Sequence, residues 1–395
     1  MTRTIESTRR RIFGCSLVLG LALPLAGAYA SEVTIYAFGG GSDGGNPPCG
    51  LISGGKGVVP GKALFYGTTQ TGGAGFGTVF QVESKGVETP LYTFSGGSDG
   101  AYPVASLIAD ASGNLYGTTE EGGAFGYGVV FKLTLGGTET VLYTFTGGAD
   151  GAFPAASLIM DDAGNLFGTA QEGGANGDGV VFEVPSGGGE TVLHSFDGSD
   201  GAFPVANLVM DKSGVLYSTT AEGGANSLGT VFKLAPGDRE SVLHSFAGGS
   251  DGAFPVAGLI MDKGGNLYGT TESGGASNDG TVFKVSRKGK EALLYAFAGE
   301  SDGASPVSAV TRQAGFLFGT TSSGGANDMG AVFKIPVKGG DDTVLFSFTG
   351  GRDGGSPRGS VLDMGGNLFG TAYAGGNSGC ASDAGCGVVF EVSPK

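Results

Sequence analysis

Short apolar runs separated by turn-forming residues dominate the chain after residue 30. One representative unit contains four of them in succession, at residues 155–161 (AASLIMD), 165–170 (NLFGTA), 179–184 (GVVFEV) and 191–196 (TVLHSF). Each run is short, rich in β-branched and aromatic residues, and bounded by Gly, Asn, Asp or Pro, which is typical of β-strands. No segment of the sequence has a helical period. The pattern predicts an all-β fold assembled from four-stranded units.

The unit recurs along the chain, and an Asp-Gly pair precedes the first strand each time. The aspartate falls at seven positions, spaced by 56, 51, 50, 51, 51 and 51 residues: Asp43, Asp99, Asp150, Asp200, Asp251, Asp302 and Asp353. Such a period is typical of propellers and solenoids. A solenoid needs polar caps on its end repeats, which neither terminus supplies. We therefore expect a seven-bladed β-propeller with four antiparallel strands in each blade.

The two ends of the chain predict how this ring closes. Residues 33–38 (VTIYAF) match the fourth strand of the unit, whereas residues 387–392 (GVVFEV) match the third. The last blade thus lacks an outer strand, and residues 31–38 are expected to supply it, because closure removes exposed sheet edges. Residues 31–395 would then form a single domain with repeats of about 51 residues.

Residues 1–30 have the pattern of a secretory signal peptide. Four arginines precede an apolar stretch at residues 15–27, which is too short to span a bilayer and ends in Ala28-Tyr29-Ala30. We expect a protein exported to the periplasm or secreted, by either the general or the twin-arginine route, since Arg10-Arg11 partly matches the twin-arginine motif.

Removing the signal peptide makes the chain more acidic. Taking its four basic and one acidic residues from totals of 22 and 37 leaves 18 and 36, a net charge near −18. Such a surface repels phosphate backbones, so we expect no nucleic acid partner. A monomer without a membrane span, binding an unidentified glycan or protein, is the expected form.

The repeat resembles a known family. Residues 265–271 (GNLYGTT), 274–276 (GGA), 280–285 (GTVFKV) and 293–297 (LLYAF) carry a resemblance to the GloVer tandem-repeat family that extends over residues 31–395. This resemblance implies an exported bacterial protein and assigns no activity. The strand order also resembles that of NHL and related propeller blades, which implies that the strand ending in Asp is innermost and the fourth is outermost.

Two loops of each unit should lie on one face of the propeller. They are the Asp-Gly-x-x-Pro loop between blades and the Gly-Gly-Ala loop between the second and third strands. The seven loop aspartates would then ring that face, where carboxylate oxygens suit calcium. Alternatively, each aspartate accepts backbone N–H groups of its own loop, which explains Asp-Gly without a ligand. Arg312 and Arg358 interrupt the repeat and would form a basic patch for an anionic ligand.

Other recurring residues have simpler interpretations. The threonines that begin the Thr pair of the second strand would present hydroxyls to a ligand, or be buried strand residues with satisfied hydroxyls. Aromatic residues before the loop proline (Tyr102, Phe153, Phe203 and Phe254) would stack on a ligand or pack between blades. The glycine within the second strand is expected to admit an aromatic residue of a neighbouring blade.

The few histidines and cysteines of the chain, and their places in the repeat, limit the chemistry that they can support. His194 and His244 both occupy the tyrosine position of the outermost strand, so neither a catalytic triad nor a histidine zinc site is expected. Cys380 and Cys386 are expected to form a local disulfide in an oxidising compartment, with Cys49 free or an alternative partner.

Two functions remain to be weighed. The first is a non-enzymatic exported propeller that binds a glycan, polymer or protein through the loop face. The alternative is a carboxylate- or metal-dependent propeller enzyme of the lyase or lactonase type. Because seven nearly equivalent loops suit repetitive recognition and no catalytic constellation is evident, we expect binding and predict no catalytic residue or required cofactor.

Overall fold

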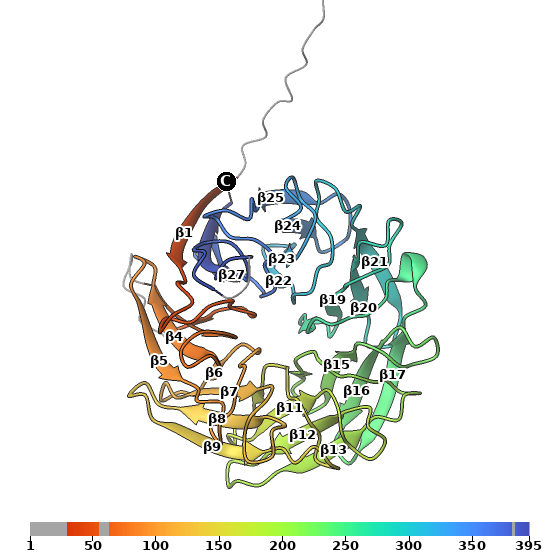
Figure 1. Ribbon diagram of the computed structural model, residues 1–395. Helices are drawn as coiled ribbons and strands as arrows, with labels where there is room; N and C mark the ends of the chain where they lie inside the picture. The colour runs from red at the N-terminus through yellow and green to blue at the C-terminus, as the bar shows by residue number, and fades with distance from the viewer. Residues whose placement is uncertain (1–29, 55–62, 381–383, 395) are drawn as a thin grey trace, which may run out of the picture.

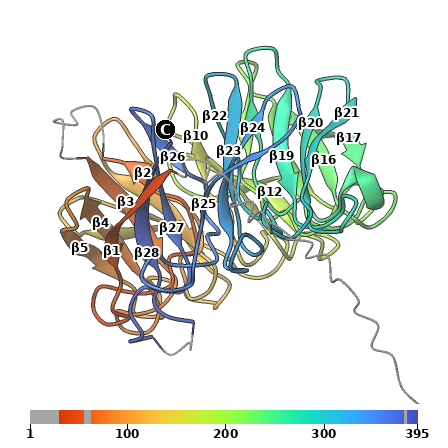
Figure 2. The ribbon, with the colours of Figure 1, turned by 90° about the horizontal axis from the view of Figure 1, so that it is seen from above.

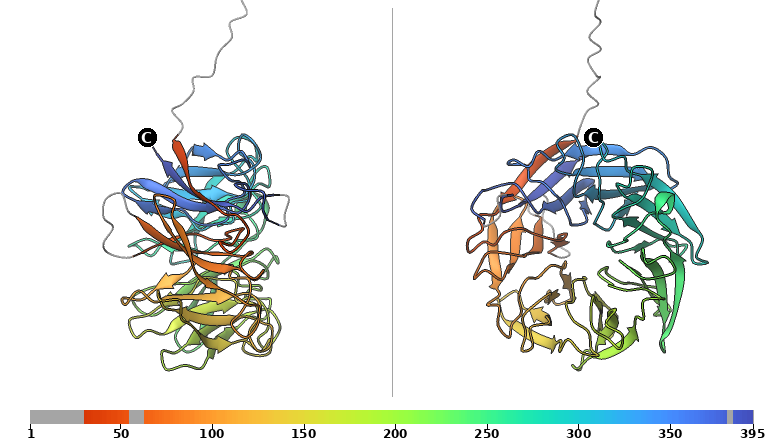
Figure 3. Two further views of the ribbon diagram at one scale, coloured as in Figure 1. Left: turned by 60° about the vertical axis from the view of Figure 1, so that its left-hand side comes forward. Right: turned by 45° about the vertical axis from the view of Figure 1, so that its right-hand side comes forward.

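The strands of the protein form a ring around a central axis (Figure 1). The computed structural model describes residues 30–54, 63–380 and 384–394, so all but the last residue of the predicted signal peptide lies outside the described residues. Within these ranges are seven separate four-stranded sheets, and every pairing is antiparallel. The predicted seven-bladed propeller is confirmed. Views along the plane of the ring show the strands running between its two faces (Figure 2; Figure 3, left).

Each blade contributes one strand to each of four concentric positions. The innermost strands are β2 (Ile52–Ser53), β6 (Ile108–Ala109), β10 (Ile159–Met160), β14 (Val209–Met210), β18 (Ile260–Met261), β22 (Thr311–Gln313) and β26 (Leu362–Met364). The second strands are β3 (Leu64–Thr69), β7 (Leu115–Thr119), β11 (Leu166–Ala170), β15 (Leu216–Thr220), β19 (Leu267–Thr271), β23 (Phe316–Thr321) and β27 (Asn367–Ala372).

The third strands are β4 (Thr78–Glu83), β8 (Val129–Leu133), β12 (Val180–Val184), β16 (Thr230–Ala235), β20 (Thr281–Val285), β24 (Ala331–Pro336) and β28 (Val388–Ser393). The outer strands are β5 (Glu88–Thr93), β9 (Glu139–Thr144), β13 (Thr191–Ser195), β17 (Arg239–Ser245), β21 (Glu291–Ala296), β25 (Thr343–Ser347) and β1 (Ser31–Ala37). A 3-10 turn, η1 (Gly249–Asp251), follows β17. Blades one to six thus take four consecutive strands each, from β2 to β25, and blade seven combines β26–β28 with β1.

The N-terminal strand closes the ring, as predicted. β1 pairs antiparallel with β28, with Ser31 opposite Ser393 and Ala37 opposite Val388. Ile35 of this strand is buried against blade one. The C-terminal blade therefore gains its outer strand from the other end of the chain.

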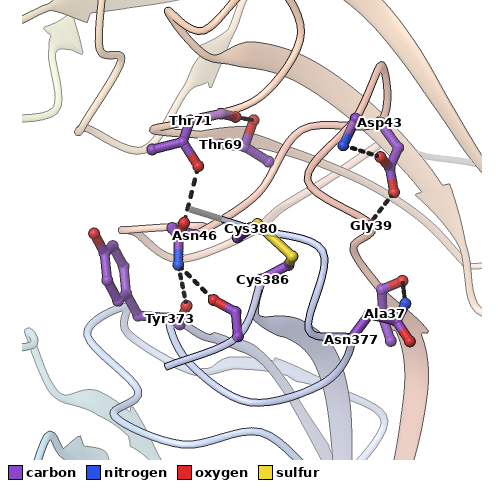
Figure 4. The surroundings of a disulfide bond; sticks show 12 residues. Ala37, Gly39, Asp43, Asn46, Thr69, Thr71, Tyr373, Asn377, Cys380 and Cys386 are labelled. Atoms are coloured by element: carbon purple, nitrogen blue, oxygen red, sulfur yellow. Dashed lines mark hydrogen bonds between the residues drawn. A yellow bond between two sulfur atoms is a disulfide. The ribbon is translucent and has the colours of Figure 1, made fainter. Parts of the chain in front are cut away.

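A loop of blade seven reinforces this closure (Figure 4). The amide of Asn377 donates to the carbonyl of Ala37 at 3.0 Å, and the amide of Asn46 donates to that of Tyr373 at 3.0 Å. The predicted disulfide between Cys380 and Cys386 is formed. Cys49 is a free, buried cysteine, 3.1 Å from the hydroxyl of Thr68.

Pairs of phenylalanines hold adjacent blades together. A phenylalanine at the end of each outer strand packs edge-on against one in the third strand of the next blade, with ring centroids 5.1–5.3 Å apart. Such contacts add about 0.5–1.5 kcal/mol each to the burial of the rings. The seven pairs are Phe38–Phe80, Phe94–Phe131, Phe145–Phe182, Phe196–Phe232, Phe246–Phe283, Phe297–Phe333 and Phe348–Phe390.

The glycine of the second strand serves this packing in a way the sequence analysis did not predict. Gly168 pairs with Phe182 of the same blade, and a Cβ on this glycine would lie 2.6 Å from that ring. The expectation that the glycine admits an aromatic residue of a neighbouring blade was therefore wrong. The blade's own phenylalanine lies over it and packs against the phenylalanine that follows the outer strand of the preceding blade, as Phe182 does with Phe145. The equivalent positions are Gly67, Gly117, Gly269, Gly319 and Gly370, with Ser218 in blade four.

A ring of hydroxyl hydrogen bonds connects the blades close to the axis. The first threonine of each Thr pair is at most 1% exposed, and it donates to a carbonyl just before the innermost strand of the next blade. Thr371 closes the ring by donating to Cys49 at 2.6 Å. The others are Thr68 to Ala105, Thr118 to Ala156, Thr169 to Ala206, Thr219 to Ala257, Thr270 to Ser308 and Thr320 to Gly359. The interpretation as buried residues with satisfied hydroxyls is confirmed.

Candidate functional site

One face of the propeller is built from the two most regular loops of each blade, and we call it the loop face. The loop that enters each blade bridges to the end of that blade's second strand, as between Ala101 and Glu121. Because these bridges recur in all seven blades, the two loops lie side by side, as the sequence predicted. The hairpins between first and second strands emerge on the opposite face, which we call the hairpin face.

The loop aspartates bind their own loops. In Asp150, one carboxylate oxygen accepts the N–H of Thr146 at 2.7 Å and the hydroxyl of Tyr143 at 2.9 Å, and the other accepts the N–H of Gly148 at 3.2 Å. These contacts place the carboxylate at the end of an outer strand, on the rim of the ring. At Asp43, Asp99 and Asp302 one carboxylate oxygen likewise accepts a backbone N–H and a tyrosine hydroxyl, and at Asp251 a histidine takes the place of the tyrosine. The other oxygen of Asp302 is buried and has no hydrogen-bond partner in the described structure.

The other two loop aspartates follow the pattern with small changes. Asp353 accepts the N–H of Thr349 at 2.8 Å, and Asp200 accepts that of Asp197 at 3.0 Å. No loop aspartate is among the described residues that line the central cavity. Turn chemistry therefore accounts for the contacts of these carboxylates, and calcium binding by them remains only a prediction.

Histidine replaces tyrosine as the partner of two loop aspartates. His194 lies 2.8 Å from Asp200 and 2.8 Å from Asp238, and His244 lies 2.9 Å from Asp251. Burial lowers the pKa of His194, but its two carboxylate partners outweigh burial and raise that pKa overall. Both histidines are remote from the axis, as expected.

A set of glutamates beside these aspartates was missed at the sequence level. Each outer strand of blades one to five begins with or near a glutamate whose pKa rises to about 7, first because of burial and second because of the loop aspartate that precedes its blade. The residues are Glu88, Glu139, Glu190, Glu240 and Glu291, and one buried carboxylate oxygen of each has no hydrogen-bond partner in the described structure. Among the residues described, these carboxylates do not assemble into groups of three or more that could hold a metal ion.

The axis of the propeller contains a cavity of about 150 Å³. The segments just before the innermost strands line it, mostly with small residues, and Arg358 is the one charged residue among the described lining. Its guanidinium lies 4.0 Å from the centre of the Tyr373 ring. Arg312 lies elsewhere, on β22, where its charge acts on Tyr268. The structure therefore does not bring the two arginines together into the predicted basic patch.

Seven non-glycine residues in the loops of the loop face have a left-handed backbone. Each precedes the loop proline, and their φ angles lie between 48° and 57°. They are Asn46, Tyr102, Phe153, Phe203, Phe254, Ser305 and Ser356. For a bulky side chain this region is a steric outlier that costs about 1–3 kcal/mol.

Hydrogen bonds on both sides hold this conformation. The N–H of Phe153 donates to the carbonyl of Tyr127 in the preceding blade at 3.0 Å, and its own carbonyl accepts the N–H of Gln171 at 3.4 Å. The same pair of contacts occurs at Tyr102, Phe203 and Phe254. The loop thus binds two blades at once. The rings of Tyr102 and Phe153 also pack against Phe76 and Tyr127 of the preceding blade, with centroids 5.9 and 5.5 Å apart, so the expected packing between blades occurs at these two positions.

Carboxylates accompany the aromatic residues on one side of the face only. The backbone of Tyr102 pairs with Glu120, that of Phe254 with Glu272, and the bridges beside Phe153 and Phe203 place Glu172 and Glu222 there. We call the half-buried aromatic residues Tyr102, Phe153, Phe203 and Phe254, with Glu120, Glu121, Glu172, Glu222 and Glu272, the aromatic–acidic arc. It extends over blades two to five, whereas the equivalent positions of blades six, seven and one hold uncharged residues such as Ser305, Ser322 and Gln70.

Burial changes the acidity of one member of the arc. It raises the pKa of Glu120, against a hydrogen bond from Gln171 at 3.3 Å that lowers it. The arc therefore combines flat apolar surfaces with carboxylate acceptors. The four aromatic residues were evident from the sequence, but the glutamates beside them were missed.

The model of the Gloeobacter/Verrucomicrobia repeat matches residues 24–163 and 261–395. The chain belongs to this repeat family. No curated protein matches the sequence of this family member. Within its described residues no helix is long and apolar enough to cross a membrane.

Solved structures resemble this repeat protein in fold alone. One is the extracellular domain of a putative one-component system from B. thetaiotaomicron, with a TM-score of 0.58, 11% identity, and coverage of 91% of this chain but only 40% of that one. Another is a putative 6-phosphogluconolactonase from Bacteroides fragilis, with a TM-score of 0.52, 18% identity, and coverage of 80% and 90%. Both are β-propeller neighbours at identities that carry no activity over.

Proposed function

We propose that this chain is an exported binding module that recognises a carbohydrate chain through the aromatic–acidic arc. The observation that carries the proposal is that four half-buried aromatic residues stand at strained backbone positions on the loop face, with glutamates next to them. Sugar rings pack their C–H faces against aromatic faces, and their hydroxyls donate to carboxylates. Export follows from the signal peptide predicted at residues 1–30.

Backbone strain supports a binding role for these positions. Strained residues that the surrounding structure holds in place occur preferentially at ligand clamps. Ser305 and Ser356 adopt the same backbone with small side chains, so the fold does not need an aromatic ring there. An aromatic ring is therefore not required to form the loop, and we infer that the rings of Phe203 and Phe254 are available to contact a ligand.

The charges of the arc restrict the kind of carbohydrate. Five glutamates belong to the arc, and Arg358 lies across the cavity. A polyuronate would meet repulsion over blades two to five. We therefore propose a neutral or amino-bearing glycan.

The enzyme alternative has less support. A propeller lactonase or lyase that uses carboxylates would need them at the axis. The described residues that line the axial cavity are mostly small, with Arg358 as their charged member. The binding interpretation needs only aromatic rings and carboxylates, which the aromatic–acidic arc supplies.

Calorimetric titration of the intact chain with soluble glycans tests the proposal. The probes are laminarin, xylan and chitosan oligomers, with polygalacturonate as the charge control. Phe203→Gly and Phe254→Gly relieve the left-handed backbone while they remove the ring, so melting temperature should change little. Loss of a stacked ring should weaken glycan binding by about tenfold or more for each variant.

Ser305→Gly is the matched control, because it makes the same backbone change at an equivalent position without removing a ring. Its affinity should equal that of the unaltered chain. Absence of heat with all neutral and amino-bearing glycans, or equal affinity of the Phe203→Gly and Ser305→Gly variants, would contradict the proposal.

A further inference from the structure

A second candidate site lies on the hairpin face, in a groove between blades three and four. Its cavity has a volume of about 350 Å³. Apolar side chains form most of its wall, among them Phe167, Leu193 and Leu216. Three carboxylates, Asp161, Glu183 and Asp238, also line it, whereas no lysine or arginine does among the residues that the structure describes.

The neighbouring groove between blades two and three provides an internal comparison. It has a volume of about 260 Å³ and is lined at equivalent repeat positions by Asp110, Tyr116 and Leu142. There, however, the third strand contributes Lys132, whose ammonium lies 5.6 Å from the centre of the Tyr116 ring. A cation at this distance from an aromatic face is attracted to it.

The same cation over an aromatic ring recurs in other blades. Lys284 lies over Tyr268 at 5.5 Å, and Lys334 lies over Phe318 at 5.9 Å. Blades two, five and six thus supply their own ammonium group at this place in the second strand, whereas blades three and seven pair the aromatic residue with a glutamate.

Blade three reverses the charge at this position. Phe167 pairs with Glu183, as Tyr116 pairs with Lys132 one blade earlier. The ion pairs found among the described residues include neither Glu183 nor Asp161. Asp238, at the mouth of the groove, is already engaged by His194. The groove therefore retains the aromatic ring and the aspartate of its neighbour but has a carboxylate in place of the lysine.

We propose that the groove between blades three and four binds an organic ammonium ion with an apolar body. The ammonium takes the place that lysine occupies in the neighbouring groove, over Phe167 and beside Glu183 and Asp161. The apolar body lies against Leu193 and Leu216. Desolvated cation–aromatic contacts of this kind recognise alkylammonium ligands.

Titration calorimetry with benzyltrimethylammonium tests this proposal on the intact chain. Benzyl alcohol and benzoate serve as neutral and anionic probes of similar shape. We expect one site for the cation, affinity that falls with added salt, and no measurable heat for benzoate. No heat with benzyltrimethylammonium, or equal affinity for benzyl alcohol, would overturn the proposal.

Two reciprocal substitutions locate the site. Glu183→Lys should place an internal ammonium over Phe167 and weaken cation binding by about tenfold or more. Lys132→Glu should give the neighbouring groove a carboxylate in place of its lysine. The number of cations bound per chain should then rise from one to two. Melting curves establish that both variants fold. Unchanged affinity in a folded Glu183→Lys variant, together with unchanged stoichiometry in a folded Lys132→Glu variant, would overturn the assignment to this groove.

Discussion

Each glutamate at the start of an outer strand is a single residue whose ionisation opposes folding. The pKa of Glu139 rises to about 7 from 4.5, first through burial and then through the charge of Asp99. A carboxyl whose pKa is raised by folding stabilises the protein fully below its unfolded pKa, and this stabilisation is lost as pH rises through the folded pKa. Because four further glutamates behave alike, the free energy of unfolding should fall between pH 4.5 and pH 8.

Glu139→Gln tests this dependence at one position. The variant should be more stable than the unaltered chain at pH 8, by about 1 kcal/mol or less because the site is partly screened by solvent. At pH 4.5 the two should unfold alike. Urea denaturation at both pH values measures the difference, with Asp162→Asn at an exposed hairpin residue as the control. A Glu139→Gln variant without any gain at pH 8 would show that the carboxyl remains solvated.

Of each aspartate–glutamate pair, only the aspartate was predicted from the sequence. The recurrence of Asp-Gly was evident, and its turn chemistry could be predicted from two adjacent residues. Glu88 faces Asp43 across a blade boundary, 45 positions away in the sequence. Such a pairing depends on how blades stack, which no local pattern specifies.

The innermost strands are shorter than their apolar runs predicted. The run at residues 155–161 contains only the two-residue strand β10. Before β10, the carbonyl of Ala156 accepts the hydroxyl of Thr118 from the preceding blade, and Ala155 lines the cavity. These residues therefore connect blades to one another, while their composition still resembles that of a strand.

Thr219→Val measures what one of these connections contributes. The hydroxyl of Thr219 donates to the carbonyl of Ala257 at 3.2 Å, in a site that is fully buried. Valine keeps the shape and removes the donor, which should lower the free energy of unfolding by about 1–2 kcal/mol. Thr219→Ser keeps a hydroxyl and should retain more of the stability, and Thr191→Val at an exposed strand end should be nearly neutral. Equal stability of the Val and Ser variants would mean that the hydrogen bond adds nothing.

At the scale of the whole molecule, the ring could be predicted from the sequence but its asymmetric face could not. A residue before proline is normally extended, so the local rule predicts an ordinary backbone at Phe153 and Phe203. Contacts with two blades instead impose φ angles of 56° and 53°. The aromatic–acidic arc depends on this tertiary constraint, which appears only when the loops of adjacent blades are brought together.

Ring closure by β1 is the feature on which the whole molecule depends, and truncation tests it. A chain that begins at residue 39 lacks β1 and Phe38, so β28 becomes an open edge and the ring of Phe80 loses its partner from the preceding blade. Loss of one buried phenylalanine alone costs about 3–5 kcal/mol, and an unpaired edge strand promotes association between chains. We expect a lower melting temperature and concentration-dependent aggregation in size-exclusion chromatography. The matched control begins at residue 31 and should remain monodisperse, and a peptide of residues 31–38 added to the truncated chain should restore part of the lost stability. If both chains melt at the same temperature, the ring does not need the N-terminal strand to stay closed.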